Sequence, residues 1–205
     1  MPMMHTIQPR PHGFTAVQIL LGAIFLAFIA QNIDHSVTTN FMFNPNNLMP
    51  WMFVTSIFLH ANIIHILFNA YALWMFGPVL ERKIGFRNFM ALFFAGGIAG
   101  SLGYYATILM HITPAYPALG ASGAVYAVLG AMAVLTPELV VLLFGIVPLT
   151  MRQAAVLWVV LEAVGTFNTG SGIASAAHLG GLILGFVWGK WELEQMKMQW
   201  RQSWK

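Results

Sequence analysis

The chain has 205 residues, of which 59% are hydrophobic and 7% are charged, whereas about 25% of the residues in a typical soluble domain are charged. A soluble fold of this length cannot bury so much apolar surface, so the composition predicts a polytopic membrane protein. Nine Lys and Arg residues spread along the chain form no basic face, which argues against nucleic acid as a partner. The lack of cysteine excludes disulfides, thiolate catalysis and Cys-ligated metals.

Six apolar stretches approach the length of about 20 residues that a helix needs to cross a bilayer. We place them near residues 14–33, 58–80, 87–110, 120–136, 152–168 and 173–190. The fourth and fifth stretches are short, which suggests tilt or shelter by neighbouring helices. No small-residue cleavage site follows the first stretch, so we expect it to remain as a span. The predicted fold class is all-α: a bundle of six transmembrane helices in one domain, 1–205.

Three further segments have their own patterns. The Asn- and Pro-rich loop 34–50 is predicted to contain turns or a re-entrant piece. The segment 138–150 is too short to cross as a helix, and its valines and proline predict an extended segment along the membrane interface. The cytoplasmic tail 191–205 contains three tryptophans and is predicted to lie on the inner interface as an amphipathic helix.

Basic residues fall on one side of the six predicted spans. They occupy the N-terminal segment, the turn between the second and third spans, the start of the fifth span and the C-terminal segment: Arg10, Arg82, Lys83, Arg87, Arg152, Lys190, Lys197, Arg201 and Lys205. The loops 34–50, 111–119 and 169–172 contain none. The positive-inside rule therefore predicts that both termini are cytoplasmic. We expect the membrane to be the plasma membrane of the cell.

Four polar side chains from three spans are predicted to lie at one depth. Counted from the inner end of each span at about 1.5 Å per residue, His65, Asn69, Ser122 and His178 lie roughly 18 to 24 Å above the inner edge of a core about 30 Å thick. His65 and Asn69 are four residues apart, so they share a helix face. Polar groups are costly inside a bilayer, which makes this layer the candidate functional site.

The sequence around Ser122 suits the stabilisation of a negative charge. Gly120 and Gly123 remove side-chain bulk beside it, so that backbone amides can approach a substrate oxygen closely. Amides at the start of a helix are unpaired and lie in a positive local potential. Tyr126 follows one turn later on the same face.

Small residues line one edge of each of the two spans that carry Ser122 and His178. This pattern permits close helix packing and predicts that the two side chains can hydrogen-bond. The edges consist of Gly123, Ala127 and Ala131 on one span and of Gly181 and Gly185 on the other.

Three motifs together resemble the rhomboid family of intramembrane serine proteases: "GASG" followed by Tyr126, "HANIIHILFN" and "AHLGGLILG". Their order and spacing agree with that family over the second to sixth spans, and "ERKIG" at 81–85 is similar to its cytoplasmic turn. The Trp-Arg pair common in the family's first outer loop is missing from 34–50.

The resemblance implies roles for the polar residues. Ser122 would be the nucleophile and His178 the general base of a dyad without a carboxylate. His65, Asn69 and the Ser122 backbone amide would form the oxyanion hole, while Tyr126 would stack on the His178 ring. It also implies that His60 and Asn62 are structural.

The same resemblance implies a substrate class. Transmembrane segments of other membrane proteins would be cleaved within the lipid bilayer, at a site open to water from the outer side. The sequence contains no recognisable nucleotide-binding motif or metal site, so we expect no cofactor, no metal and no nucleotide or nucleic-acid partner.

Alternatives remain open at this stage. Ser122 could be a helix cap or a packing residue, and His65 and Asn69 could merely bridge helices. Glu162 could orient His178 as the carboxylate of a triad, but the favoured interpretation is a protonated or hydrogen-bonded group in the bundle.

Two other classes of function are possible. A metal or proton transporter could use several of the histidines, but the spans contain no Asp or Lys inside the membrane and lack paired proline-broken helices. A catalytically inactive relative would be expected to lose Ser122 or His178, and both are present.

Overall fold

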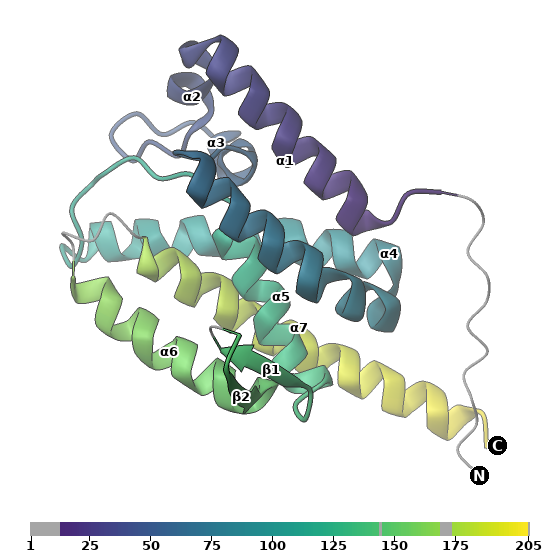
Figure 1. Ribbon diagram of the computed structural model, residues 1–205. Helices are drawn as coiled ribbons and strands as arrows, with labels where there is room; N and C mark the ends of the chain where they lie inside the picture. Colours follow the sequence, from purple (N-terminus) through teal and green to yellow (C-terminus); the bar gives the residue numbers. More distant parts are fainter. Residues whose placement is uncertain (1–12, 144, 169–173, 205) are drawn as a thin grey trace.

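The computed structural model describes residues 13–143, 145–168 and 174–204 and is a helical bundle with one small β-hairpin (Figure 1). The predicted loop 169–172 and the termini that carry Arg10 and Lys205 lie outside the described residues. The elements are α1 (Ala16–Ile33), α2 (His35–Phe41), α3 (Met52–Thr55), the 3-10 turn η1 (Ser56–Phe58), α4 (Ile63–Leu109), α5 (Ser122–Leu135), β1 (Val140–Leu143), β2 (Val147–Thr150), α6 (Met151–Phe167) and α7 (Ser175–Gln202).

Two helices, α1 and α4, are long and apolar enough to cross a membrane. Helix α4 contains the second and third predicted spans, which are separated at Gly85, where φ is 82° and the backbone is not helical. The chain reverses direction there (Figure 1). The two limbs, 63–84 and 86–109, are each about 33 to 36 Å long at 1.5 Å per residue, enough to cross the hydrocarbon core.

The predicted start of the second span at residue 58 is wrong. Residues 56–58 form η1, and α4 begins at Ile63. Asn62 is its N-cap, because its side-chain oxygen accepts a hydrogen bond from the backbone amide of His65 at 2.9 Å. An Asn cap satisfies one of the unpaired amides of the first turn and so fixes where the helix begins.

Helix α5 lies in the middle of the bundle and is buried along most of its length. It packs against α7 through the small residues predicted from the sequence. A Cβ atom added to Gly181 would lie 2.0 Å from the carbonyl oxygen of Gly123, and one added to Gly185 would lie 2.1 Å from that of Ala127. The backbones are therefore in contact, and the predicted close packing of these two helices is confirmed.

Substituting Gly181 with alanine is expected to lower the melting temperature of the detergent-solubilised protein. The added methyl group overlaps the Gly123 carbonyl, so α5 and α7 must separate, and such overpacking costs about 1–3 kcal/mol. Gly22→Ala is the matched control, because Gly22 lies in exposed helix with nothing within 4 Å of an added Cβ. The control should melt at or above the wild-type temperature, since alanine favours helix. Equal melting of both variants would contradict this packing.

Glu81 ties the start of α1 to the turn in α4. Its carboxylate accepts hydrogen bonds from the backbone amides of Ala16 and Val17 at 3.1 and 3.2 Å, and the residue is 1% exposed. A carboxylate is favourable there, because a helix N-terminus carries a partial positive charge. The N-terminal end of α1 and the turn of α4 consequently lie on the same side of the bundle.

The connecting segments differ in part from their predictions. Within the segment 138–150, residues 140–143 and 147–150 are extended, as predicted, and they pair as an antiparallel hairpin, with Val140 opposite Thr150 and Leu143 opposite Val147. The loop 34–50 contains a short helix, α2, whose first turn is capped by Asp34 through the Ser36 amide at 2.8 Å. The tail is helical, as predicted, and continues α7 without interruption to Gln202, because residues 190–202 contain neither Gly nor Pro.

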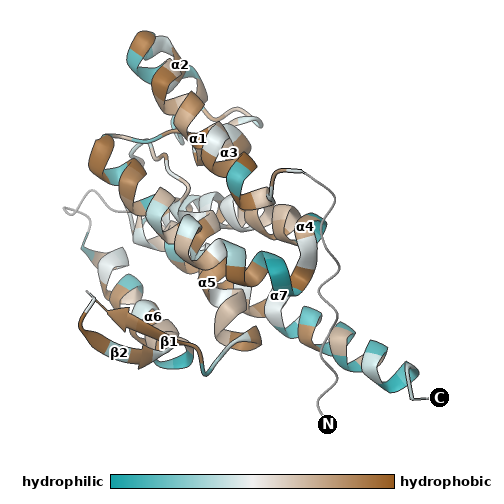
Figure 2. Cartoon of the chain, turned by 45° about the vertical axis from the view of Figure 1, so that its right-hand side comes forward, coloured by the Kyte–Doolittle hydropathy of each residue, from teal (hydrophilic) through white to brown (hydrophobic). Residues whose placement is uncertain are grey.

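The outward faces of the helices are apolar. Helix α6 exposes Val156, Val160, Val164 and Phe167, which are 53% to 74% accessible. Figure 2 shows hydrophobic residues along α1 and the hairpin, and more hydrophilic residues toward the C-terminal end of α7. An exterior of this kind suits lipid rather than water.

Candidate active site

The loop before α5 places Ser122 at the first position of that helix. The amide of Gly120 donates to the carbonyl of Ser56 at 2.9 Å, and the amide of Ala121 approaches Nε2 of His60 at 3.5 Å. Gly120 has a φ of +132°, and a Cβ there would lie 2.8 Å from the His65 ring. Glycine is therefore required for both backbone conformation and space.

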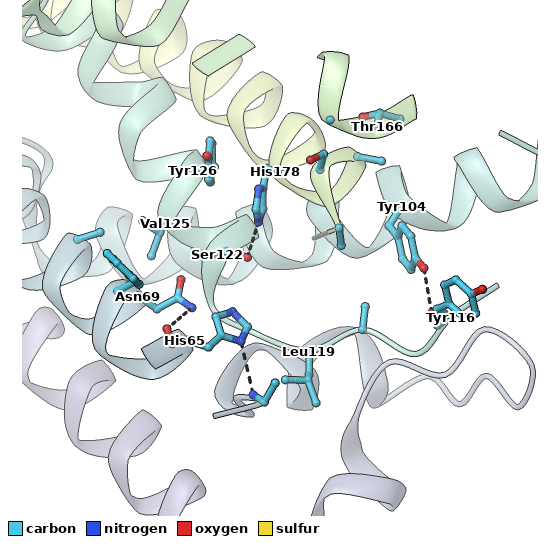
Figure 3. Close-up of a pocket in the computed structure, with 18 of the residues that line it drawn as sticks. His65, Asn69, Tyr104, Tyr116, Leu119, Ser122, Val125, Tyr126, Thr166 and His178 are labelled. Carbon is cyan, nitrogen blue, oxygen red and sulfur yellow. Dashed lines mark hydrogen bonds between the residues drawn. The ribbon is translucent and has the colours of Figure 1, made fainter. Parts of the chain in front are cut away.

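His178 of α7 lies opposite Ser122. Its Nε2 atom is 2.8 Å from the Ser122 Oγ, and the contact is partly buried (Figure 3). This is the distance of a normal hydrogen bond between a hydroxyl and an imidazole nitrogen. The close approach of α5 and α7 brings the two residues together although 56 positions separate them in the sequence.

Tyr126, one turn after Ser122, lies flat against the His178 ring. The ring centroids are 4.4 Å apart and the planes differ by 7°. Trp158 of α6 also contacts the tyrosine ring edge-on, with the centroids 6.5 Å apart. The histidine ring is thus held in one orientation by aromatic packing.

Glu162 of α6 reaches the same histidine from the opposite side to Ser122. Its Oε1 atom is 3.0 Å from Nδ1 of His178, and the side chains of both residues are 12% accessible. The hydroxyl of Tyr126 donates a hydrogen bond to the same oxygen. The sequence favoured a protonated or hydrogen-bonded Glu162 within the bundle; the structure shows it hydrogen-bonded there, with its carboxylate next to the His178 ring.

His65 and Asn69 lie beside Ser122 on the first limb of α4 (Figure 3). The amide of Ala61 donates to Nδ1 of His65 at 3.5 Å, so Nε2 carries the ring hydrogen, and this is the nitrogen next to Gly120. The side-chain amide of Asn69 donates one hydrogen to the His65 carbonyl at 3.1 Å, and an amide NH₂ has a second hydrogen to donate.

These residues line one cavity of about 860 Å³. Its wall includes Ser122, His178, Tyr126, His65 and Asn69, and also residues of α6 such as Trp158 and Thr166. A volume of this size accommodates a peptide segment of a few residues. The five side chains to which the resemblance gives a role in catalysis or in stacking on His178 thus line one cavity.

Other predicted residues have different places. Gly123 does not open the cavity: a Cβ there would meet Gly100 of α4 at 3.4 Å and Ala177 of α7 at 3.6 Å, so this glycine serves helix packing. His60 is buried, and its Nδ1 approaches the Phe58 carbonyl at 3.3 Å while Nε2 faces the Ala121 amide. Sequence reasoning missed this contact, through which His60 supports the residue before Ser122.

The histidines considered for a transporter lie partly together. His60 and His65 are in ring contact, with centroids 5.0 Å apart. Within the part of the chain that the structure describes, no group of three or more His, Cys, Asp or Glu residues could hold a metal ion.

The family model described as "Rhomboid domain" matches residues 47–195, which include every residue of this cavity discussed above. The chain belongs to the rhomboid family. Membership implies an integral membrane protein, in agreement with the apolar exterior.

Three rhomboid relatives illustrate the range of similarity. "Rhomboid protease GluP" of Bacillus subtilis is 33% identical over 190 residues, 84% of this chain and 32% of the relative. "Rhomboid protein 1, mitochondrial" of Saccharomyces cerevisiae is 35% identical over 151 residues, 73% of this chain and 43% of the relative. "Rhomboid-like protease 2" of Toxoplasma gondii is 30% identical over 154 residues, 73% and 51%. The chain therefore spans between a third and about half of the length of these curated relatives.

Proposed function

We propose that this rhomboid protein is an intramembrane serine endopeptidase that cleaves transmembrane segments of other membrane proteins. The observation that carries the proposal is the 2.8 Å contact between Ser122 Oγ and His178 Nε2 inside the cavity. A serine hydroxyl is a weak nucleophile until an adjacent base accepts its proton. The names of the relatives GluP and rhomboid-like protease 2, both proteases, support the same reaction class.

In the first step, the Ser122 Oγ attacks the carbonyl carbon of the scissile peptide while Nε2 of His178 accepts the hydroxyl proton. A C–O bond forms and the carbonyl becomes a tetrahedral oxyanion. The amide of Ser122 has no acceptor within its own helix, because it lies in the first turn of α5. Together with Nε2–H of His65 and the second amide hydrogen of Asn69, it would stabilise that charge.

In the second step, the protonated His178 returns its proton to the leaving amine, the C–N bond breaks, and an acyl-enzyme ester on Ser122 remains. A water molecule then gives its proton to Nε2 and attacks the ester carbonyl. The second tetrahedral intermediate collapses, the proton returns to Ser122, and a carboxylic acid product leaves. Each of these transfers uses groups of the chain and water, with no cofactor.

The substrate class follows from the position of the site in a membrane protein. A hydrogen-bonded helix hides its carbonyl groups, so cleavage would favour segments that unwind near their outer end and have small residues at the scissile bond. We infer a six-span arrangement in which the two limbs of α4 count as separate spans and water enters from the outer side. The plasma membrane is the proposed location, although one relative is named as mitochondrial.

Reporter fusions are expected to place both termini in the cytoplasm. The proposal rests on the basic residues, all of which lie on one side of the spans, and on the contact of Glu81 with the start of α1, which puts that end of α1 beside the basic turn of α4. A reporter enzyme that works only in the cytoplasm should be active when fused to the C-terminus. A reporter enzyme that works only outside the cytoplasm should be active when inserted in 111–119. The opposite pattern would place the site near the inner face of the membrane.

Labelling with a fluorophosphonate tests the proposed function directly. Such a probe forms a covalent bond with a serine only where a base activates its hydroxyl, so mass spectrometry of the labelled protein should locate the probe on Ser122. His178→Ala should abolish labelling, while Ser203, an exposed serine at the far end of α7 from His178 whose hydroxyl donates to the Trp200 carbonyl, should remain unlabelled in both proteins. Failure to label the folded wild-type protein, combined with no cleavage of model transmembrane substrates in detergent, would overturn the proposal.

A further inference from the structure

The carboxylate of Glu162 occupies a position for which the Ser122–His178 pair alone gives no reason. Glu162 lies on α6 between Val160 and Val164, which are 53% and 67% exposed, whereas Glu162 itself is 9% exposed. A carboxyl group on an apolar span must find polar partners inside the protein, and such groups mark functional sites by default. Here the partners are Nδ1 of His178 and the hydroxyl of Tyr126, both in the candidate active site.

Nδ1 of His178 needs a partner, because it is buried and makes no well-directed hydrogen bond among the described residues. The Oε1 atom of Glu162 lies 3.0 Å away, at ion-pair distance. The same oxygen also accepts a hydrogen bond from the Tyr126 hydroxyl. Since the rings of Tyr126 and His178 are stacked with their centroids 4.4 Å apart, Oε1 serves two groups that lie in different, parallel planes.

We propose that Glu162 is a positioning residue, which holds His178 in the tautomer that can accept the proton of Ser122. With the ring hydrogen on Nδ1, facing Oε1, the lone pair of Nε2 faces the Ser122 hydroxyl. When Nε2 takes up the proton, the nearby carboxylate stabilises the imidazolium and does not itself become protonated. The proposal rests on the proposed function and extends its machinery from two residues to three.

Tyr126 contributes to the same arrangement. Its hydroxyl donates to Oε1, which keeps this oxygen an acceptor, and the Ser175 hydroxyl also hydrogen-bonds the carboxylate. If Oε1 instead carried a proton and donated it to Nδ1, Nε2 would bear the ring hydrogen and could not activate Ser122. Tyr126 thus stacks on the His178 ring and, through Oε1, also favours the tautomer of His178 with its hydrogen on Nδ1. The activity is therefore expected to depend on the Glu162 carboxylate, which the sequence alone favoured only as a protonated or hydrogen-bonded group in the bundle.

Glu162→Gln should lower kcat by about 10² to 10⁴-fold with little change in KM, because the amide can donate to Nδ1 and favour the wrong tautomer. Glu192→Gln is the matched control: it makes the same substitution in a second buried carboxylate, which accepts a hydrogen bond from Trp188 at 3.3 Å on α7. Its kcat should equal that of the wild type. Tyr126→Phe keeps the ring stack, so its kcat should fall less than that of Glu162→Gln. The double variant should have a kcat little lower than that of Glu162→Gln alone.

A spectroscopic readout separates positioning from a merely structural role. In protein with ¹⁵N-labelled histidine, the signals of His178 are those missing from His178→Ala, and they should show a protonated Nδ1 and an unprotonated Nε2. Glu162→Gln should reverse this tautomer, and Glu162→Asp should restore it in part.

Several outcomes would overturn the proposal. These are an Nε2-protonated wild-type ring, an unchanged tautomer in Glu162→Gln, and a kcat within a few-fold of wild type. If Glu162→Gln fails to fold, the tautomer in the wild-type spectrum and the kcat of Tyr126→Phe still test the proposal. A wild-type protein with the expected tautomer but without cleavage or probe labelling would refute the proposed function and leave the role of Glu162 in orienting the ring intact.

Discussion

Substituting Ser122 with alanine is expected to reduce kcat for a model transmembrane substrate by about 10⁶-fold, to the level of the background. The substitution removes the only oxygen that contacts Nε2 of His178, at 2.8 Å, among the described residues, so no acyl-enzyme can form. His178→Ala should have nearly the same effect, because Ser122 then lacks the base that accepts its proton. The double variant should lose little more than either single one, since the two groups act as a unit.

The measurement is single-substrate kinetics on purified protein in detergent, with melting temperatures recorded on the same preparations. Ser122 begins a helix without a side-chain cap hydrogen bond, so alanine should leave the fold unchanged and the melting temperature close to that of wild type. Ser203→Ala, at the exposed C-terminal end of α7, controls for the loss of a hydroxyl elsewhere. Full activity of either Ser122→Ala or His178→Ala would remove that residue from the proposed mechanism.

The helix packing around this pair was accessible to sequence reasoning because it depends on patterns along one chain. Small residues repeated every four positions, such as Gly181 and Gly185, define an edge that allows contact whatever the partner. Counting residues along the spans placed Ser122 and His178 at similar depths. The similar depth of the two residues and the small-residue edges of their helices together were enough to predict that Ser122 and His178 lie within hydrogen-bond reach.

The role of Glu162 was less accessible, because depth says nothing about the rotation of a helix. The signal was nevertheless present in the sequence. In a membrane span the apolar face is directed to lipid, and Glu162 is two residues, or about 200°, from both Val160 and Val164. That rotation directs its carboxylate inward, toward His178. Using the apolar stripe of α6 as an outward marker would have favoured the triad alternative.

Segments without periodicity were predicted least well. The run at 140–143 is short and entirely apolar, so its extended conformation could be inferred from valine content, but not its pairing with 147–150. Helix α2 is seven residues long and depends on the Asp34 cap, a local contact that hydropathy does not register. The start of α4 at Ile63 likewise depends on one N-cap residue, Asn62.

Substituting Asn69 or His65 with alanine is expected to lower kcat by up to about 10² to 10³-fold while the melting temperature changes little. The structure supports a role in the transition state rather than in joining helices. The hydrogen bonds that each side chain makes are local: Asn69 donates to the His65 carbonyl one turn earlier, and His65 accepts from the Ala61 amide. Their remaining donors line the cavity beside Ser122, where a developing oxyanion would use them.

Gln31→Ala gives the scale for a side chain that does join separate segments. Its amide accepts from the backbone of His60 at 2.9 Å and donates to Thr38 at 2.9 Å, so its removal should lower the melting temperature measurably. A loss of about 0.6–2 kcal/mol is the effect expected of a polar bridge inside a membrane bundle. If His65 and Asn69 were such bridges, their alanine variants would show a similar decrease.

Comparison of kcat with melting temperature in the same preparations decides between the two roles. In the oxyanion interpretation kcat falls, the substrate KM changes little, and the double variant loses less than the product of the two single losses, because the Ser122 amide still supports residual turnover. In the bridging interpretation the melting temperature of the variant falls, while its folded fraction cleaves substrate with the wild-type kcat. Lowered melting with an intact kcat would therefore remove His65 and Asn69 from the active site and leave the Ser122 amide as the remaining donor to the oxyanion.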